Sequence, residues 1–114
     1  MADNITYINV DEGVKRVMNN GKLFAKLLTK FKSDTNINDI ESAFEQGDLK
    51  NACNSTHTLK GLAANLALTE LFNQVLEMET QLKAGTMNKD QLAAVKNVLT
   101  LTYNEMDKVI EQYA

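Results

Sequence analysis

Proline is absent from this 114-residue sequence, and glycine occurs only five times. Both residues interrupt regular structure, so their scarcity favours long helices that end at the few glycines and at clusters of Asn and Asp. The length fits one domain, and 44% hydrophobic with 24% charged residues is typical of a globular protein with one core. We therefore expect a single domain over residues 1–114.

Cysteine is scarcer still, because Cys53 is the only one. A lone cysteine excludes an internal disulfide and a metal site built from several thiolates. No stretch approaches the roughly 18 apolar residues of a membrane span. The N-terminal Met-Ala-Asp-Asn lacks the basic and apolar regions of a secretory signal. These absences predict a cytoplasmic protein without a membrane partner.

Neither charge sign dominates, since 12 Lys and Arg face 15 Asp and Glu, for a net charge of −3. The basic residues are spread along the sequence without a run, which argues against binding nucleic acid. The sequence also has no glycine-rich phosphate loop, so we expect no ATP site. A single histidine lacks companions for a metal site, and none is expected.

The apolar residues recur at helical spacing along most of the chain. After an extended lead-in over residues 4–10, we expect a short helix capped by Asp11 and a second helix over residues 23–31. Further helices are expected from residue 37 to Gly47, from Asp48 to about residue 66, from a cap at Thr69 to Gly85 and from Asn88 to about Tyr113. Short loops make neighbouring helices antiparallel. The sequence therefore predicts an all-α, up-down four-helix bundle whose short N-terminal helices cover one end.

The only histidine, His57, lies in the middle of the helix that Asp48 opens. On a helical wheel, His57 falls on the flank of one apolar arc, made of Leu49, Ala52, Thr56, Leu59, Ala63 and Leu66. Lys60 falls between the histidine and the arc, and the small residues Gly61 and Ala64 lie beside it. The opposite, solvent side carries Asn54, Thr58 and Asn65.

This arrangement suits a phosphoryl acceptor. A glycine in a helix interior costs about 1 kcal/mol relative to alanine, and close approach of another molecule is one reason to keep Gly61. The small neighbours leave the imidazole of His57 uncovered, and Lys60 is close enough to meet an anion on the ring. Phosphoryl transfer requires mainly positioning and charge neutralisation, which these residues supply.

The run His57-Thr58-Leu59-Lys60-Gly61 resembles the His-x-x-Lys-Gly signature of histidine-containing phosphotransfer (Hpt) domains. The resemblance includes the upstream Asp11, Arg16, Leu23, Leu27 and Phe31 pattern and Leu71 and Glu77 downstream. It implies a phosphocarrier, not an enzyme, in which neutral His57 accepts a phosphoryl group from a receiver-domain aspartate and passes it on. Lys60 would neutralise the phosphate. Gly61, with Ala64, Asn54, Thr58 and Asn65, would meet the docked partner.

The resemblance also implies response-regulator receiver domains and a hybrid histidine kinase as partners. We expect a monomer, because the apolar stripes are used by packing within the bundle and Gly61 offers no hydrophobic seam. No cofactor is implied, because a divalent ion would belong to the receiver. One departure is Ala67, where many members carry glycine ten residues after the histidine. Two alternatives stay open: a helical adaptor that binds a partner through the His57 face without chemistry, and a Cys53–His57 nucleophilic pair.

Overall fold

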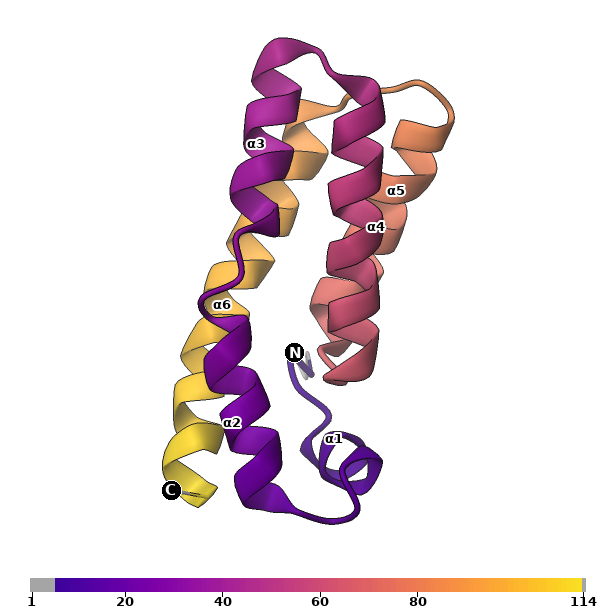
Figure 1. Cartoon of the computed structure of the whole chain (residues 1–114). Coiled ribbons are helices and arrows are strands. Elements are labelled where there is room, and N and C mark those ends of the chain that lie inside the picture. Colours follow the sequence, from indigo (N-terminus) through magenta and orange to yellow (C-terminus); the bar gives the residue numbers. More distant parts are fainter. Residues whose placement is uncertain (1–5, 114) are drawn as a thin grey trace, which may run out of the picture.

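The computed structural model describes residues 6–113, which contain six helices and no strand (Figure 1). In chain order these are α1 (Val10–Arg16), α2 (Gly21–Phe31), α3 (Asn36–Gln46), α4 (Leu49–Asn65), α5 (Thr69–Lys83) and α6 (Lys89–Tyr113). None of these helices is long and apolar enough to cross a membrane. The expected all-α class is therefore confirmed.

The helices α3 to α6 form the up-down bundle that the short loops predict. The 25-residue α6 is long enough to pair with both α2 and α3, which follow one another along it (Figure 1). The rings of Phe31 and Tyr103 lie 6.3 Å apart between α2 and α6. Further along, Lys96 of α6 forms an ion pair with Glu41 of α3. Besides lying at one end, α2 thus extends the bundle along the C-terminal half of α6.

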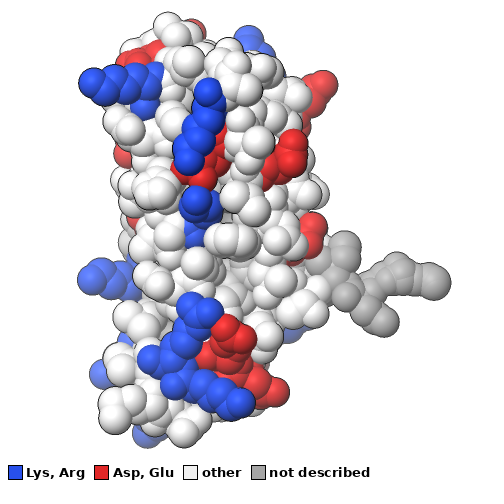
Figure 2. Space-filling model, turned by 90° about the vertical axis from the view of Figure 1, so that its right-hand side faces the viewer, with Lys and Arg blue, Asp and Glu red and all other residues white. Residues whose placement is uncertain are grey.

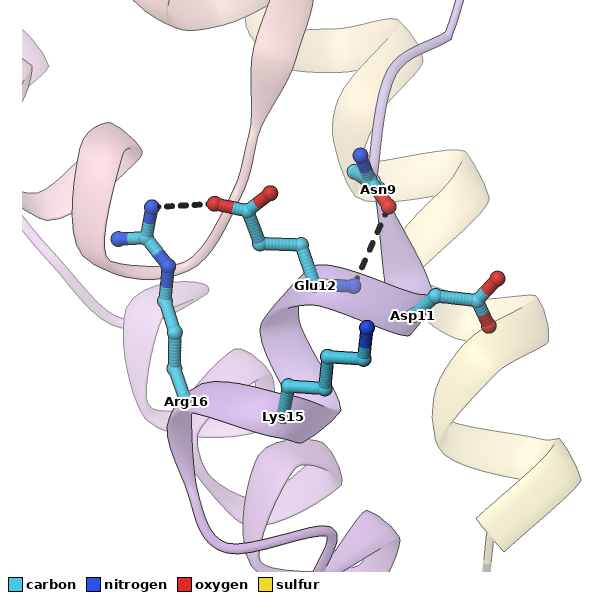
Figure 3. A pocket seen from close by; sticks show the side chains of 5 residues that line it. All are labelled: Asn9, Asp11, Glu12, Lys15 and Arg16. Atoms are coloured by element: carbon cyan, nitrogen blue, oxygen red, sulfur yellow. Dashed lines mark hydrogen bonds and ion pairs between the residues drawn. The ribbon is translucent and has the colours of Figure 1, made fainter.

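The short helix α1 covers the end of the bundle at which α4 finishes. The Arg16 guanidinium donates to the Ala64 carbonyl over 2.7 Å and pairs with Glu12 at 2.6 Å. The cap of α1 is Asn9, whose side chain accepts from the Glu12 amide, so the expected cap at Asp11 is wrong (Figure 3). Asn9 can act as the cap because residues 6–9 are neither helix nor strand. Residues 4–5 of the expected lead-in lie outside the described residues.

The core is continuous through all of the long helices, and its most deeply buried side chains include Phe24, Leu28, Ile40, Leu59, Leu71 and Val95. On α4, the expected apolar arc is confirmed for its members from Ala52 to Leu66. Leu49 is the exception, because it is 37% exposed. It occupies the first position of α4, where the helix has only just entered the bundle.

Three helices end in the same hydrogen-bonded turn. After α3 and α5, the left-handed residue is a glycine, Gly47 with φ of 67° and Gly85 with φ of 90°. After α4 the same position is held by Ala67, with φ of 56°. The Leu68 amide donates to the Ala63 carbonyl over 2.9 Å and the Ala67 amide to Ala64 over 3.2 Å, which is the Schellman pattern. A helix end that usually takes glycine is therefore closed here by alanine.

Candidate functional site

The helix α4 carries His57 near its middle. Its N-terminus is fixed by Asp48, whose carboxylate accepts from the Asn51 amide over 3.1 Å, as the sequence predicts. The apolar arc then turns one side of the 17-residue helix into the core. His57 lies on the flank of that arc, and its side chain is 68% exposed. The ring is therefore accessible from outside while its helix is held rigidly.

A buried carboxylate from α5 contacts the ring. Glu79 Oε2 lies 2.8 Å from His57 Nδ1, and the Glu79 side chain is only 2% exposed. The other carboxylate oxygen, Oε1, lies 2.6 Å from Lys60 Nζ. A second ammonium, on Lys83, lies 3.7 Å from Oε2 and is itself 63% exposed. One buried acid thus holds the histidine and two lysines together.

The position of Glu79 follows from the packing of α5 against α4. The buried stripe of α5 is the predicted one, with Leu71, Val75, Met78 and Leu82. Glu79 follows Met78 directly and lies at the edge of this stripe, where α5 meets the flank of α4 that carries His57 and Lys60. One turn later, Lys83 lies on the same edge. The face seen from the α5 side has basic and acidic side chains interspersed, without one large patch of either sign (Figure 2).

The surroundings of Glu79 keep its carboxyl group charged. Burial alone would raise the pKa of Glu79, but the hydrogen bonds from Lys60 and His57 and the charges of both lysines outweigh it, so that the pKa is lowered. A carboxylate can only accept hydrogen bonds. The proton of a neutral His57 ring therefore belongs on Nδ1, and Nε2 carries the free lone pair. An exposed imidazole with its outer nitrogen unprotonated is a nucleophile.

The other residues that the sequence singles out surround the open side of the ring. Gly61 is exposed, and a Cβ built on it would meet no described atom within 4 Å apart from its chain neighbours and the backbone of its own helix. Ala64 is half-buried, while three polar residues are exposed: Asn54, Thr58 and Asn65. Lys60 is 23% exposed. Apart from Lys60, these residues carry only small or medium-sized side chains.

Two members of the cluster, Glu79 and Lys83, escaped the sequence analysis. Glu79 had one detectable signal, because it is an acid directly beside the buried Met78 in a strongly periodic helix. Lys83 had none beyond its spacing of one turn from Glu79. Cys53 is half-buried and free, and within residues 6–113 no hydrogen bond joins it to His57. The group that orients the ring is Glu79.

Comparison with protein families gives one result that agrees with this geometry. A family model described as Hpt domain matches residues 27–112. The chain belongs to the Hpt domain family. Membership implies a histidine phosphotransfer role in phosphorelay signalling, and it places the chain among phosphocarriers rather than ATP-using kinases. Searches of curated proteins and of solved structures found no match.

Proposed function

We propose that this Hpt domain accepts a phosphoryl group on Nε2 of His57 from a receiver-domain aspartate and passes it to another receiver. The observation that carries the proposal is the 2.8 Å contact between Nδ1 of the exposed His57 ring and the buried Glu79 carboxylate. This contact leaves Nε2 as the reacting atom. A cytoplasmic location and a monomeric state belong to the same proposal.

Both halves of the transfer can proceed without moving a proton to or from solvent. In acceptance, the Nε2 lone pair attacks phosphorus, a bond forms between them, and the bond from phosphorus to the aspartate oxygen breaks. The ring then carries a positive charge, because its Nδ1 proton stays between the ring and Glu79. In donation, an aspartate oxygen attacks phosphorus, the bond to Nε2 breaks, and the ring leaves as neutral imidazole. Glu79 compensates the ring charge throughout.

The two lysines have different tasks in this proposal. Lys60 lies 2.6 Å from the carboxylate and is mostly covered, so it balances Glu79 before any phosphate arrives. It can share its charge with a phosphoryl group on the neighbouring ring. Lys83 is more exposed and more loosely held, at 3.7 Å. Its ammonium is free to turn towards the phosphoryl group without leaving Glu79 unpaired.

Docking of the receiver depends on the small residues beside the ring. The receiver must bring its aspartate into line with Nε2, so the two backbones approach closely. Open space at the Cβ position of Gly61 means that a larger residue there fits the fold and projects only into the partner. The proposal therefore separates docking from folding at this position.

The test is transfer from a receiver domain phosphorylated with acetyl phosphate and Mg²⁺, taken from the protein's own organism. We expect an acid-labile, base-stable adduct on the unaltered chain, located at His57 by mass spectrometry, and none on His57→Gln. Gly61→Gln should slow transfer at least tenfold, while the exposed α6 control Ala93→Gln should transfer at the parental rate. Phosphoramidate, a small donor that needs no docking, should label all but the His57 variant.

Two results would overturn the proposal. If no receiver of the organism forms an adduct with the chain, a helical adaptor without chemistry becomes the better interpretation. An adduct on a residue other than His57 would place the chemistry elsewhere. Parental transfer by Gly61→Gln would refute the docking argument alone and would leave the carrier chemistry standing.

A further inference from the structure

The cations of this acidic protein are distributed unevenly over the fold. The segment from residue 13 to residue 33 holds six Lys and Arg and no Asp or Glu, whereas the remaining chain holds the other six with all 15 acids. Within this segment, α2 carries lysines at intervals of one turn, at positions 22, 26 and 30. All three are exposed. The helix α2 and its flanking residues are therefore basic although the net charge of the chain is negative.

The exposed side of α2 combines these lysines with apolar surface. We call Lys22, Leu23, Lys26 and Lys30 the α2 lysine face. Leu23 is 41% exposed, and Lys26 and Lys30 follow it at helical spacing on the same side. Among the described residues, none of the three lysines forms an ion pair, in contrast to Lys32, which is paired with Asp107. Their charges are thus not balanced by these neighbours.

A groove connects this face to the helix of His57. Its volume is about 780 Å³, and α1, α2, the segment after α2 and α4 all line it. Its apolar surface comes from both sides, with Leu27 of α2 opposite Leu62 of α4. Lys30 lies on its α2 side and Asn65 on its α4 side. Asn65 is one turn after Gly61, which is one turn after His57, so the surface is continuous from the ring to the α2 lysine face.

We propose that the phosphoryl-exchanging receiver also meets the α2 lysine face, and that it presents there Asp and Glu side chains flanking an apolar ridge. The inference rests on the proposed function, since it assigns the basic face and the His57 surface to one partner. Charge complementarity argues for the acidic side chains, and Leu23 with the groove argues for the apolar ridge. Attraction over this face speeds the encounter that places aspartate against His57.

A protein partner fits better than an anionic membrane. A membrane is a large plane of negative charge, and it would also meet Asp34, which lines the same groove as Lys30. A protein of similar size can contact the α2 lysine face and the adjoining surface alone. Because that surface is continuous with the surface around His57, a partner bound at His57 can contact the α2 lysine face at the same time.

The test compares two charge reversals at opposite ends of the bundle. Lys26→Glu/Lys30→Glu changes the α2 lysine face, and Lys50→Glu/Lys89→Glu makes the same net change at the starts of α4 and α6 (Figure 1). With phosphorylated receiver below saturation and about 50 mM salt, we expect the first variant to transfer at least tenfold more slowly. The second should stay within about threefold of the parent. The difference should shrink at about 0.5 M salt, where charges are screened.

Two further measurements keep the result interpretable. Lys26→Gln/Lys30→Gln should give an intermediate rate, and phosphoramidate labelling of His57 should be unchanged in every variant, which excludes a folding defect. Equal losses in both reversals, or parental transfer by Lys26→Glu/Lys30→Glu, would overturn the inference while leaving the carrier function intact. Parental transfer combined with binding to phosphatidylserine vesicles would assign the face to a membrane instead. Failure of the unaltered chain to accept phosphate from any receiver would overturn the proposed function and this inference with it.

Discussion

Replacing Lys60 by methionine tests the charge cluster at the site most directly. The substitution keeps an unbranched side chain of similar length and removes only the ammonium 2.6 Å from Glu79 Oε1. Glu79 is 2% exposed, so its carboxylate would lose its closest cation while remaining out of water. Breaking a buried ion pair by removing one partner costs about 3–5 kcal/mol. Here Lys83 and His57 still contact Glu79, so we expect a loss of about 2 kcal/mol at pH 7.

The loss should depend on pH in a definite direction. The native pKa of Glu79 is lowered, so ionised Glu79 adds stability above its unfolded pKa of about 4.3, and this stability is lost as the pH falls through the native pKa. Without Lys60, fewer cations oppose the effect of burial on Glu79, so the pKa of Glu79 in the native protein rises. The variant Lys60→Met therefore loses most stability at pH values at which the Glu79 carboxyl group is ionised. The gap in unfolding free energy between parent and variant should therefore be widest near pH 7 and narrow as the pH falls through the native pKa of Glu79, first that of the variant and then that of the parent.

Urea denaturation followed by circular dichroism at a series of pH values measures this gap. The double variant Lys60→Met/Glu79→Gln, which removes both charges, should recover most of the lost stability. Lys83→Met is the matched control, because Lys83 is 63% exposed and lies farther from the carboxylate, at 3.7 Å, so it should change stability much less. A gap that stays constant with pH, or a Lys60→Met protein as stable as the parent at pH 7, would refute the assignment of Lys60 to the buried Glu79.

Three further substitutions test other parts of the structure. His57→Gln should lower the thermal midpoint only slightly, because the ring is 68% exposed and Lys60 and Lys83 still contact Glu79; a large fall measured by calorimetry would make His57 a structural residue. Ala67→Gly should raise the unfolding free energy by about 1 kcal/mol, since φ of 56° strains alanine, and the reciprocal Gly47→Ala should lower it in the same urea titration. Thr56→Val should stabilise by about 1 kcal/mol, because the buried Thr56 hydroxyl has no hydrogen-bond partner within residues 6–113; a lower unfolding free energy of the variant in the urea titration would show that the hydroxyl does have a partner.

The helices could be predicted from the sequence because their apolar stripes are strong and their ends carry distinct residues. Leu71, Val75 and Met78 recur at helical spacing and are all buried, and Gly47 and Gly85 close helices where the pattern stops. The errors lie at helix starts, where several residues can act as caps. Asn9 rather than Asp11 caps α1, and α5 begins at Thr69 itself without a side-chain cap.

The histidine could be found because one helix contains all of the information that places it. The flank position of His57, the nearby Lys60 and the open Gly61 follow from the periodicity of α4 alone. Glu79 comes from another helix, 22 residues later, and its contact with His57 depends on the rotation and height of α5 against α4. The spacing of apolar residues gives the buried side of each helix, but it does not give this relative height. The contact between Glu79 and His57 therefore could not be predicted from the apolar pattern.

Glu79 also shows why a charged group occupies a position where an apolar one would stabilise the bundle more. The carboxylate is nearly as buried as its neighbour Met78, and its desolvation is offset by Lys60, His57 and Lys83. A leucine at this position would need no such partners, and it would leave Nδ1 of His57 without an acceptor. The ring could then rotate, and either nitrogen could carry the proton. What the buried charge provides is one orientation and one tautomer of a surface histidine, and the proposed transfer needs both, because the ring nitrogen would have to meet phosphorus in line with a docked aspartate.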